Sequence, residues 1–183
     1  MKKLFSFLLV AILAIATVGC SQKKESKVID LNQLKTSITE TYGEDYTAQD
    51  INLTLFGDMY ASIEDLYKDR YGLTSDMYEE VIAQMSIISA QSDEFVAVHA
   101  KEGQADAVLA ALTNYQDTLK NDSMQYPMTQ IKIQASQVIK KDNYVFFVML
   151  GTPSMDAETD EEILASAKEQ NQKAVDIINS FFE

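Results

Sequence analysis

Helical and strand-like spacings of hydrophobic residues alternate along the chain. Over residues 31–42 the apolar positions recur at intervals of three and four, which predicts an amphipathic helix that begins after Asp30 and ends at Gly43. A second stripe of the same period runs from Met59 to Arg70, with Gly72 in the position expected of a C-cap. Two helices are therefore predicted to open the folded part of the chain.

Two pairs of strands are predicted next. Residues 81–89 and 94–101 are rich in β-branched and apolar side chains and are joined by a short polar loop, and residues 130–140 and 144–150 form a second pair around a tight connection. A helical stripe over residues 104–120 separates the two pairs. The last strand is apolar on both faces, so it is predicted to be a central strand that is covered on each side.

A long helix is predicted to close the chain. Thr159 and Glu162 have the spacing of a capping box, and an apolar stripe continues from Ile163 to Phe181. The fold class predicted from these elements is α+β: an antiparallel sheet in β-β-α-β-β order, with N-terminal helices and a long C-terminal helix covering the sheet, and one helix layer on each face. We expect residues 28–183 to form this single domain.

The first 20 residues have the layout of a secretory signal. Two lysines precede an uncharged apolar run, residues 4–18, which is shorter than the roughly 20 residues that a membrane-spanning helix needs. Gly19 and Cys20 end this run in the manner of a bacterial lipobox, in which a peptidase cuts before a lipid-modified cysteine. We expect residues 1–19 to be a lipoprotein signal peptide, Cys20 to carry acyl chains such as palmitate, and residues 20–27 to be a flexible tether.

Composition and charge exclude several classes of protein. The chain has 15 basic and 28 acidic side chains, a formal net charge of -13, which disfavours nucleic acid as a partner. A single cysteine permits neither an intramolecular disulfide nor a CxxC zinc site. The six glycines include no phosphate-binding loop, and no motif predicts a cofactor.

Three side chains of the 94–101 segment are the candidate ligand-binding residues: Glu94, His99 and Lys101. His99 is the only histidine and no GxSxG-type nucleophile turn accompanies it, so a partly buried, hydrogen-bonded strand histidine is the favoured interpretation. Glu94 follows Asp93 and could bind a ligand at the rim of the sheet, although carboxylates beside a loop are usually solvated. Strict alternation directs Glu94 and Lys101 to opposite faces. No residue is predicted to be catalytic.

An acidic segment, residues 156–162, raises the question of a metal site. Its alternating carboxylates are similar to the start of an EF-hand loop, but the central glycine and the correctly spaced glutamate are missing. Acidic residues also favour the N-terminal end of a helix, which accounts for them more simply. No metal site is predicted.

Several short motifs lie between residues 58 and 151. They are Tyr71, Gly72 and Leu73 after a helix, the pair Asp93 and Glu94 opening the strand at 95–98, Tyr126 with Pro127 before a hairpin, and Asn143, Tyr144 and Val145 opening the last strand. With these motifs the chain resembles a widespread, uncharacterised family of Gram-positive cell-surface lipoproteins, known only as a domain of unknown function. The resemblance implies a location and a fold, and it transfers no catalytic residue.

The sequence therefore predicts an extracytoplasmic lipoprotein held on the cell membrane by lipid on Cys20. Its expected role is that of a non-enzymatic module that binds an envelope protein, peptide or polymer. Two alternatives stay open. One is a small envelope hydrolase that uses Glu94, His99 or the cluster around Asp156, and the other is a solute-capturing lipoprotein of a transporter.

Overall fold

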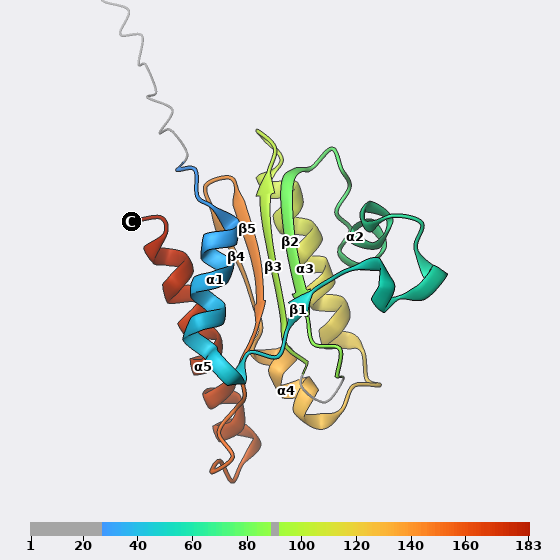
Figure 1. Ribbon diagram of the computed structural model, residues 1–183. Helices are drawn as coiled ribbons and strands as arrows, with labels where there is room; N and C mark the ends of the chain where they lie inside the picture. Colours follow the sequence, from blue (N-terminus) through green and yellow to red (C-terminus); the bar gives the residue numbers. More distant parts are fainter. Residues whose placement is uncertain (1–26, 89–91) are drawn as a thin grey trace, which may run out of the picture.

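The protein is built around one five-stranded antiparallel sheet (Figure 1). The computed structural model describes residues 27–88 and 92–183, so the predicted signal peptide, Cys20 and most of the predicted tether lie outside the described residues. The strands are β1 (Gln49–Asp50), β2 (Tyr78–Met85), β3 (Glu94–Ala100), β4 (Gln137–Lys141) and β5 (Tyr144–Met149). Their spatial order is β1-β2-β3-β5-β4, so β3 is the middle strand and β5 lies between β3 and β4.

Within the described residues, five α-helices cover the sheet. They are α1 (Leu31–Tyr42), α2 (Ile63–Tyr71), α3 (Ala105–Asn121), α4 (Pro127–Ala135) and α5 (Asp160–Ser180). Three short 3-10 turns, Gly43–Asp45, Leu53–Leu55 and Gly57–Met59, lie in the connection between α1 and α2. Among the residues that the structure describes, no helix combines the length and the apolar character needed to cross a membrane.

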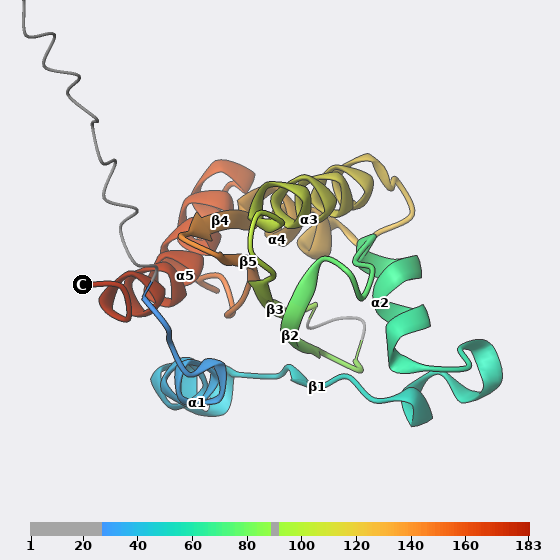
Figure 2. The ribbon, with the colours of Figure 1, turned by 90° about the horizontal axis from the view of Figure 1, so that it is seen from above.

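A separate hydrophobic core fills each face of the sheet. On one face, Val96 and Val98 of β3 pack with residues of α2, α3 and α4. On the other face, Phe95 and Ala97 pack with residues of α1 and α5. Figure 2 shows α1 and α5 on one side of the sheet and α2 and α3 on the other. The predicted α+β fold with one helix layer on each face is confirmed, as is β5 as a strand buried along its whole length.

The capping signals in the sequence act as predicted. The Asp30 carboxylate accepts the N–H groups of Asn32 and Gln33 at 2.8 and 3.1 Å, which satisfies two donors that a helix start leaves free. Gly72 ends α2 in the left-handed conformation. At the start of α5, both hydrogen bonds of the capping box between Thr159 and Glu162 are present.

The segment between α3 and β5 differs from the predicted strand over residues 130–140. Its first part is the helix α4, and only Gln137–Lys141 form a strand. Pro127 occupies the first turn of α4, where its missing N–H costs no hydrogen bond. Buried Lys132 and Ile133 are consecutive in the chain, so burial in α4 does not alternate as it would in a half-buried strand. The β-β-α-β-β order is confirmed, with α4 added to the crossover and the two-residue β1 added at one edge.

The first and last helices meet on the same face of the sheet. The Tyr42 hydroxyl at the end of α1 donates to the Gln170 carbonyl of α5 at 2.6 Å. Gly151, with a φ of +81°, lies against the same contact, where an added Cβ would stand 2.9 Å from both Gln170 Cβ and Tyr42 Cε1. Both the backbone conformation and the close approach therefore require glycine at position 151.

Candidate functional site

Glu94 is the centre of a buried polar cluster on the α2 and α3 side of the sheet. It is the first residue of β3, and it is only 3% exposed. Its Oε1 accepts the Tyr71 hydroxyl at 2.6 Å, and its Oε2 accepts the Tyr115 hydroxyl at 2.7 Å. The expectation of a solvated carboxylate at the rim of the sheet is therefore wrong for Glu94.

Arg70 of α2 completes this cluster. Its Nε and Nη2 donate to both oxygens of Glu94 at 3.0–3.1 Å, which is the bidentate geometry that makes such pairs strong. The guanidinium also lies 5.5 and 5.4 Å from the ring centroids of Tyr71 and Tyr115. Burial alone lowers the pKa of Arg70, but the negative charge of Glu94 outweighs it and the pKa is raised.

The same arrangement keeps both phenols protonated. Burial, followed by the charge of Glu94, raises the pKa of Tyr71 and that of Tyr115 well above the usual value. Their two hydroxyls and the guanidinium together donate five hydrogen bonds to the carboxylate in the described structure. Because its lone pairs are already engaged, Glu94 is poorly suited to accept a proton from a substrate.

A polar pocket of about 390 Å³ opens beside this cluster. Arg70 keeps 27% of its side-chain surface exposed and forms part of the wall. The pocket is lined by Tyr60, Asp69, Arg70, Tyr71, Gly72, Asn114, Tyr115 and Thr118. Tyr60 donates its hydroxyl to Asp69 at 3.0 Å, so the wall offers an aromatic ring, a carboxylate, an amide and a guanidinium together. We name this group of residues the Arg70 pocket.

The structure does not bring the three candidate residues of the 94–101 segment together. Glu94 faces α2 and α3, whereas His99 is half-buried and stacks on Tyr144 at 4.4 Å, on the face covered by α1 and α5. The Nζ of Lys101 donates to the Ser75 carbonyl at 2.8 Å. Glu94 and His99 therefore do not form a catalytic pair, and Lys101 lies one residue beyond the end of β3.

A second buried ion pair lies directly beside the first in the sequence. Asp93 is 2% exposed, and its Oδ1 accepts from Lys132 of α4 at 2.5 Å. Its Oδ2 accepts the hydroxyl and the N–H of Thr47 at 2.7 and 3.2 Å. Ser86 contacts both Thr47 and the backbone N–H of Asp93. Glu94 is thus a structural anchor for α2 and α3, and Asp93 is one for α4 and for the segment before β1.

The acidic segment at 156–162 lies at the start of α5. Asp160, Glu161 and Glu162 occupy the first turn of the helix and are exposed. Backbone N–H groups of Glu158 and Thr159 donate to Glu162 and lower its pKa. Within residues 27–88 and 92–183, no group of three or more His, Cys, Asp or Glu side chains is arranged to hold a metal ion.

Arg70, Tyr71 and Tyr115 were not singled out as site residues from the sequence. One signal was present, because Arg70 falls on the apolar stripe of its helix, where a charged residue implies a buried partner. The tyrosines follow apolar patterns and differ from core residues only in the hydroxyl.

The Arg70 pocket lies within the part of the chain that matches a known family. Residues 56–150 match the family described as Domain of unknown function (DUF4358). The matched region runs from the segment before α2 to the residue after β5, and so contains every residue of the Arg70 pocket. No curated protein and no solved structure matches the chain.

Proposed function

Because the chain belongs to the DUF4358 family, whose function is unknown, we propose a function from its own residues: a lipid-anchored, non-enzymatic binding protein on the extracytoplasmic face of the cell membrane. The proposal includes the signal peptide at residues 1–19, the lipid on Cys20 and a Gram-positive cell surface. The apolar run that ends at Gly19 and Cys20 supports this location.

The observation that carries the binding role is the Arg70 pocket. Its wall is built from side chains that the fold already holds in place, since Arg70 and Tyr115 are both fixed by Glu94. A rigid wall loses little conformational entropy when a ligand binds. The same contacts occupy the carboxylate of Glu94, which is the member of the hydrolase alternative that lies beside this pocket, so the geometry here favours binding over bond cleavage.

The chemistry of the pocket fits a neutral ligand rich in hydroxyl groups. Arg70 and Asn114 can donate hydrogen bonds, Asp69 and Asn114 can accept them, and the Tyr60 ring offers an apolar face. A sugar ring presents donors, acceptors and an apolar face in the same small volume. The net charge of -13 disfavours polyanions. The proposed ligand is therefore a neutral glycan segment of the cell envelope.

A binding measurement tests the ligand class. We expect an N-acetylglucosamine tetramer to bind the full-length protein in detergent, and Asn114→Ala to weaken binding about tenfold because one bidentate polar partner, about 1.4 kcal/mol, is lost. Asn114 is exposed on α3, so its removal should leave the fold intact. Isothermal titration calorimetry measures both constants.

The matched control is Asp117→Ala, an exposed position on the same helix that does not line the pocket. This variant should bind like the parent protein. Equal affinity of the parent and the Asn114 variant would place the ligand elsewhere, and absence of binding by the parent would reject the neutral glycan.

The anchor has a separate test. Cys20→Ser removes the sulfur that carries the lipid, so we expect a precursor that keeps residues 1–19 and lacks acyl chains. Mass spectrometry of the protein recovered from membranes measures both changes. A variant with the mature mass and the acylation of the parent protein would refute the assignment of Cys20.

A further inference from the structure

One edge of the sheet is only partly covered. The outer neighbour of β2 is β1, which has two residues against the eight of β2 and pairs only with Gln84 and Met85. Beyond this pairing, the Ile51 N–H donates to the Ala83 carbonyl at 2.9 Å. After Ile51 the chain continues into the 3-10 turns that lead to α2. The part of β2 before Ala83 therefore lacks a neighbour on this side among the described residues.

The register shows which backbone groups this open edge presents. The Ser86 N–H donates to the Asp93 carbonyl at 2.8 Å, which fixes the phase of the antiparallel ladder between β2 and β3. Because bonded and non-bonded pairs alternate, Gln84, Ile82 and Glu80 form hydrogen bonds with β3. Val81 consequently directs its N–H and its carbonyl away from β3, toward the open edge.

A groove of about 280 Å³ follows this edge. Asn32 and Lys35 of α1 form one wall, and Tyr67 of α2 forms part of the other. Figure 2 shows α1 and α2 on opposite sides of the sheet at its β1 and β2 end. The groove at the edge of β2 is lined from both helices, so an extended chain placed there would direct its side chains alternately to the two walls.

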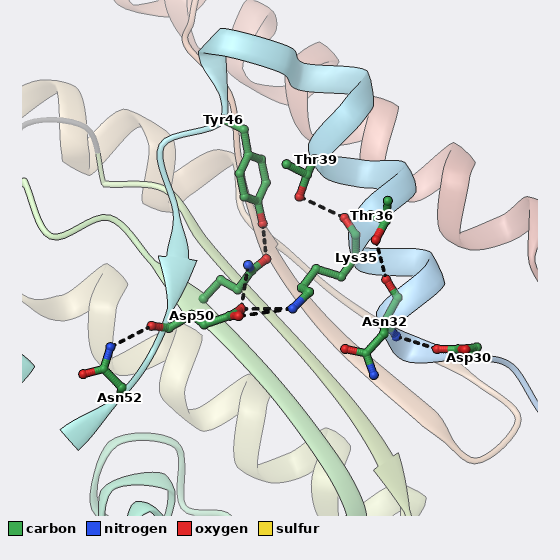
Figure 3. Close-up of polar contacts among 9 residues, drawn as sticks. Asp30, Asn32, Lys35, Thr36, Thr39, Tyr46, Asp50 and Asn52 are labelled. Carbon is green, nitrogen blue, oxygen red and sulfur yellow. Dashed lines mark hydrogen bonds and ion pairs between the residues drawn. The ribbon is translucent and has the colours of Figure 1, made fainter. Parts of the chain in front are cut away.

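Asp50 closes one end of the groove. Its carboxylate accepts from Lys35 at 3.2 Å and from the Gln84 side chain at 2.8 Å, and the Gln84 amide oxygen accepts the Tyr46 hydroxyl. Figure 3 shows Lys35 reaching from α1 to Asp50 on β1. This network fixes the position of β1 at the point where an added strand would begin.

The charged side chains that line the groove are Lys35, Asp50 and Glu80, and Glu79 precedes Glu80 on β2. Lys35 is paired with Asp50, whereas Glu79 and Glu80 on β2 are exposed. Burial raises the pKa of Tyr67 to about 12, and Tyr78, Asp50 and Glu64 add smaller contributions in the same direction. Cationic side chains would therefore find carboxylates along the edge and the aromatic face of Tyr67 in one wall.

We propose that the open edge of β2 binds an extended, basic segment of a partner protein, which adds to the sheet as a strand antiparallel to β2 next to Val81. Backbone hydrogen bonds to Val81 would provide the docking, and lysine or arginine side chains would face the surrounding carboxylates. A second copy of this chain is the less favourable occupant because two chains of net charge -13 repel each other.

The test uses an acetylated and amidated hexapeptide of alternating lysine and valine, labelled for fluorescence anisotropy, with the full-length protein in detergent. We expect saturable binding. A glutamate and valine hexapeptide should bind at least tenfold more weakly, and so should the lysine peptide with its backbone nitrogens methylated. Equal binding of the methylated peptide would overturn strand addition, and equal binding of the acidic peptide would overturn the predicted charge.

Two variants locate the site. Val81→Pro removes the outward N–H and leaves the hydrogen bonds between β2 and β3 intact, because Pro is tolerated on an edge strand. It should weaken lysine-peptide binding at least tenfold, whereas Val81→Thr, which keeps the N–H, should stay within twofold. Circular dichroism checks the fold of each variant.

If Val81→Pro fails to fold, Glu79→Lys combined with Glu80→Lys provides the second variant, with the same expected loss. Unchanged binding by a folded variant of either kind would exclude this edge. A dimer in sedimentation velocity that Val81→Pro dissociates would assign the edge to a second copy and overturn the proposal.

Discussion

Glu94→Ala is expected to lower the free energy of unfolding by about 3–5 kcal/mol, the cost of removing one member of a buried ion pair. The substitution leaves the guanidinium of Arg70 without its carboxylate and removes the acceptor of two buried hydroxyls, those of Tyr71 and Tyr115. The three groups belong to two helices, so α2 and α3 lose a common attachment to β3. Chemical denaturation followed by circular dichroism measures the change.

Glu40→Ala is the matched control for this substitution. Glu40 is exposed on α1, where loss of a carboxylate should change the stability by less than about 0.5 kcal/mol. Glu94→Gln retains one acceptor oxygen, so its loss of stability should lie between those of Glu94→Ala and Glu40→Ala. If Glu94→Ala were as stable as the Glu40 variant, the cluster would not hold the helices together.

Alkaline pH is expected to unfold the protein within about two pH units above pH 10. Tyr42, Tyr71 and Tyr115 are each no more than 6% exposed, and burial is the largest cause that raises the pKa of each. A raised pKa in the folded state means that the stability is fully present below the unfolded value of about 10 and is lost as the pH rises above it. Above pH 10, each of these buried phenols then lowers the free energy of unfolding by about 1.4 kcal/mol per pH unit, and the three together lower it by about 4 kcal/mol per unit.

Two signals recorded along the same titration test this prediction. Phenolate absorbance of the buried tyrosines should appear together with the loss of the circular dichroism signal, because these phenols ionise only when the chain unfolds. Tyr42→Phe should shift the transition to higher pH, since one ionising group is gone. A folded protein in which all nine tyrosines ionise near pH 10 would contradict the burial of these rings.

The elements that were predicted from the sequence are those whose own residues determine them. The helix α1 has a cap at Asp30 and a regular apolar stripe, and α5 has both halves of a capping box at Thr159 and Glu162. The uninterrupted apolar run of β5 indicated burial on both faces. In each case local capping and burial favour the same structure.

The helix α4 was not predicted because one buried position holds a charged residue. Lys132 lies between two isoleucines, and a lysine flanked by apolar residues has the alternation of a half-buried strand. In the fold this lysine is 5% exposed, because Asp93, 39 residues earlier in the chain, provides its counter-charge. The local sequence pattern around Lys132 cannot indicate such a distant partner.

The candidate site was predicted only in part for the same reason. Glu94 was selected as a candidate, but its burial depends on Arg70, which reaches it from a helix 24 positions earlier. Whether a carboxylate beside a loop is solvated or buried is decided by what packs over it. The placement of Arg70 on an apolar helical stripe was the one local indication of that partner.

The contact between α1 and α5 determines when, during synthesis of the chain, the core on this face can form. The Tyr42 and Gln170 contact joins positions 128 residues apart, and the core on this face takes Leu34 and Ile38 from α1 and Ala174 and Ile178 from α5. As the chain is made from its N-terminus, the first helix emerges with an apolar stripe that its partner cannot yet cover. This core can therefore be completed only after α5 has been synthesised, and until then the apolar stripe of α1 lacks the helix that covers it.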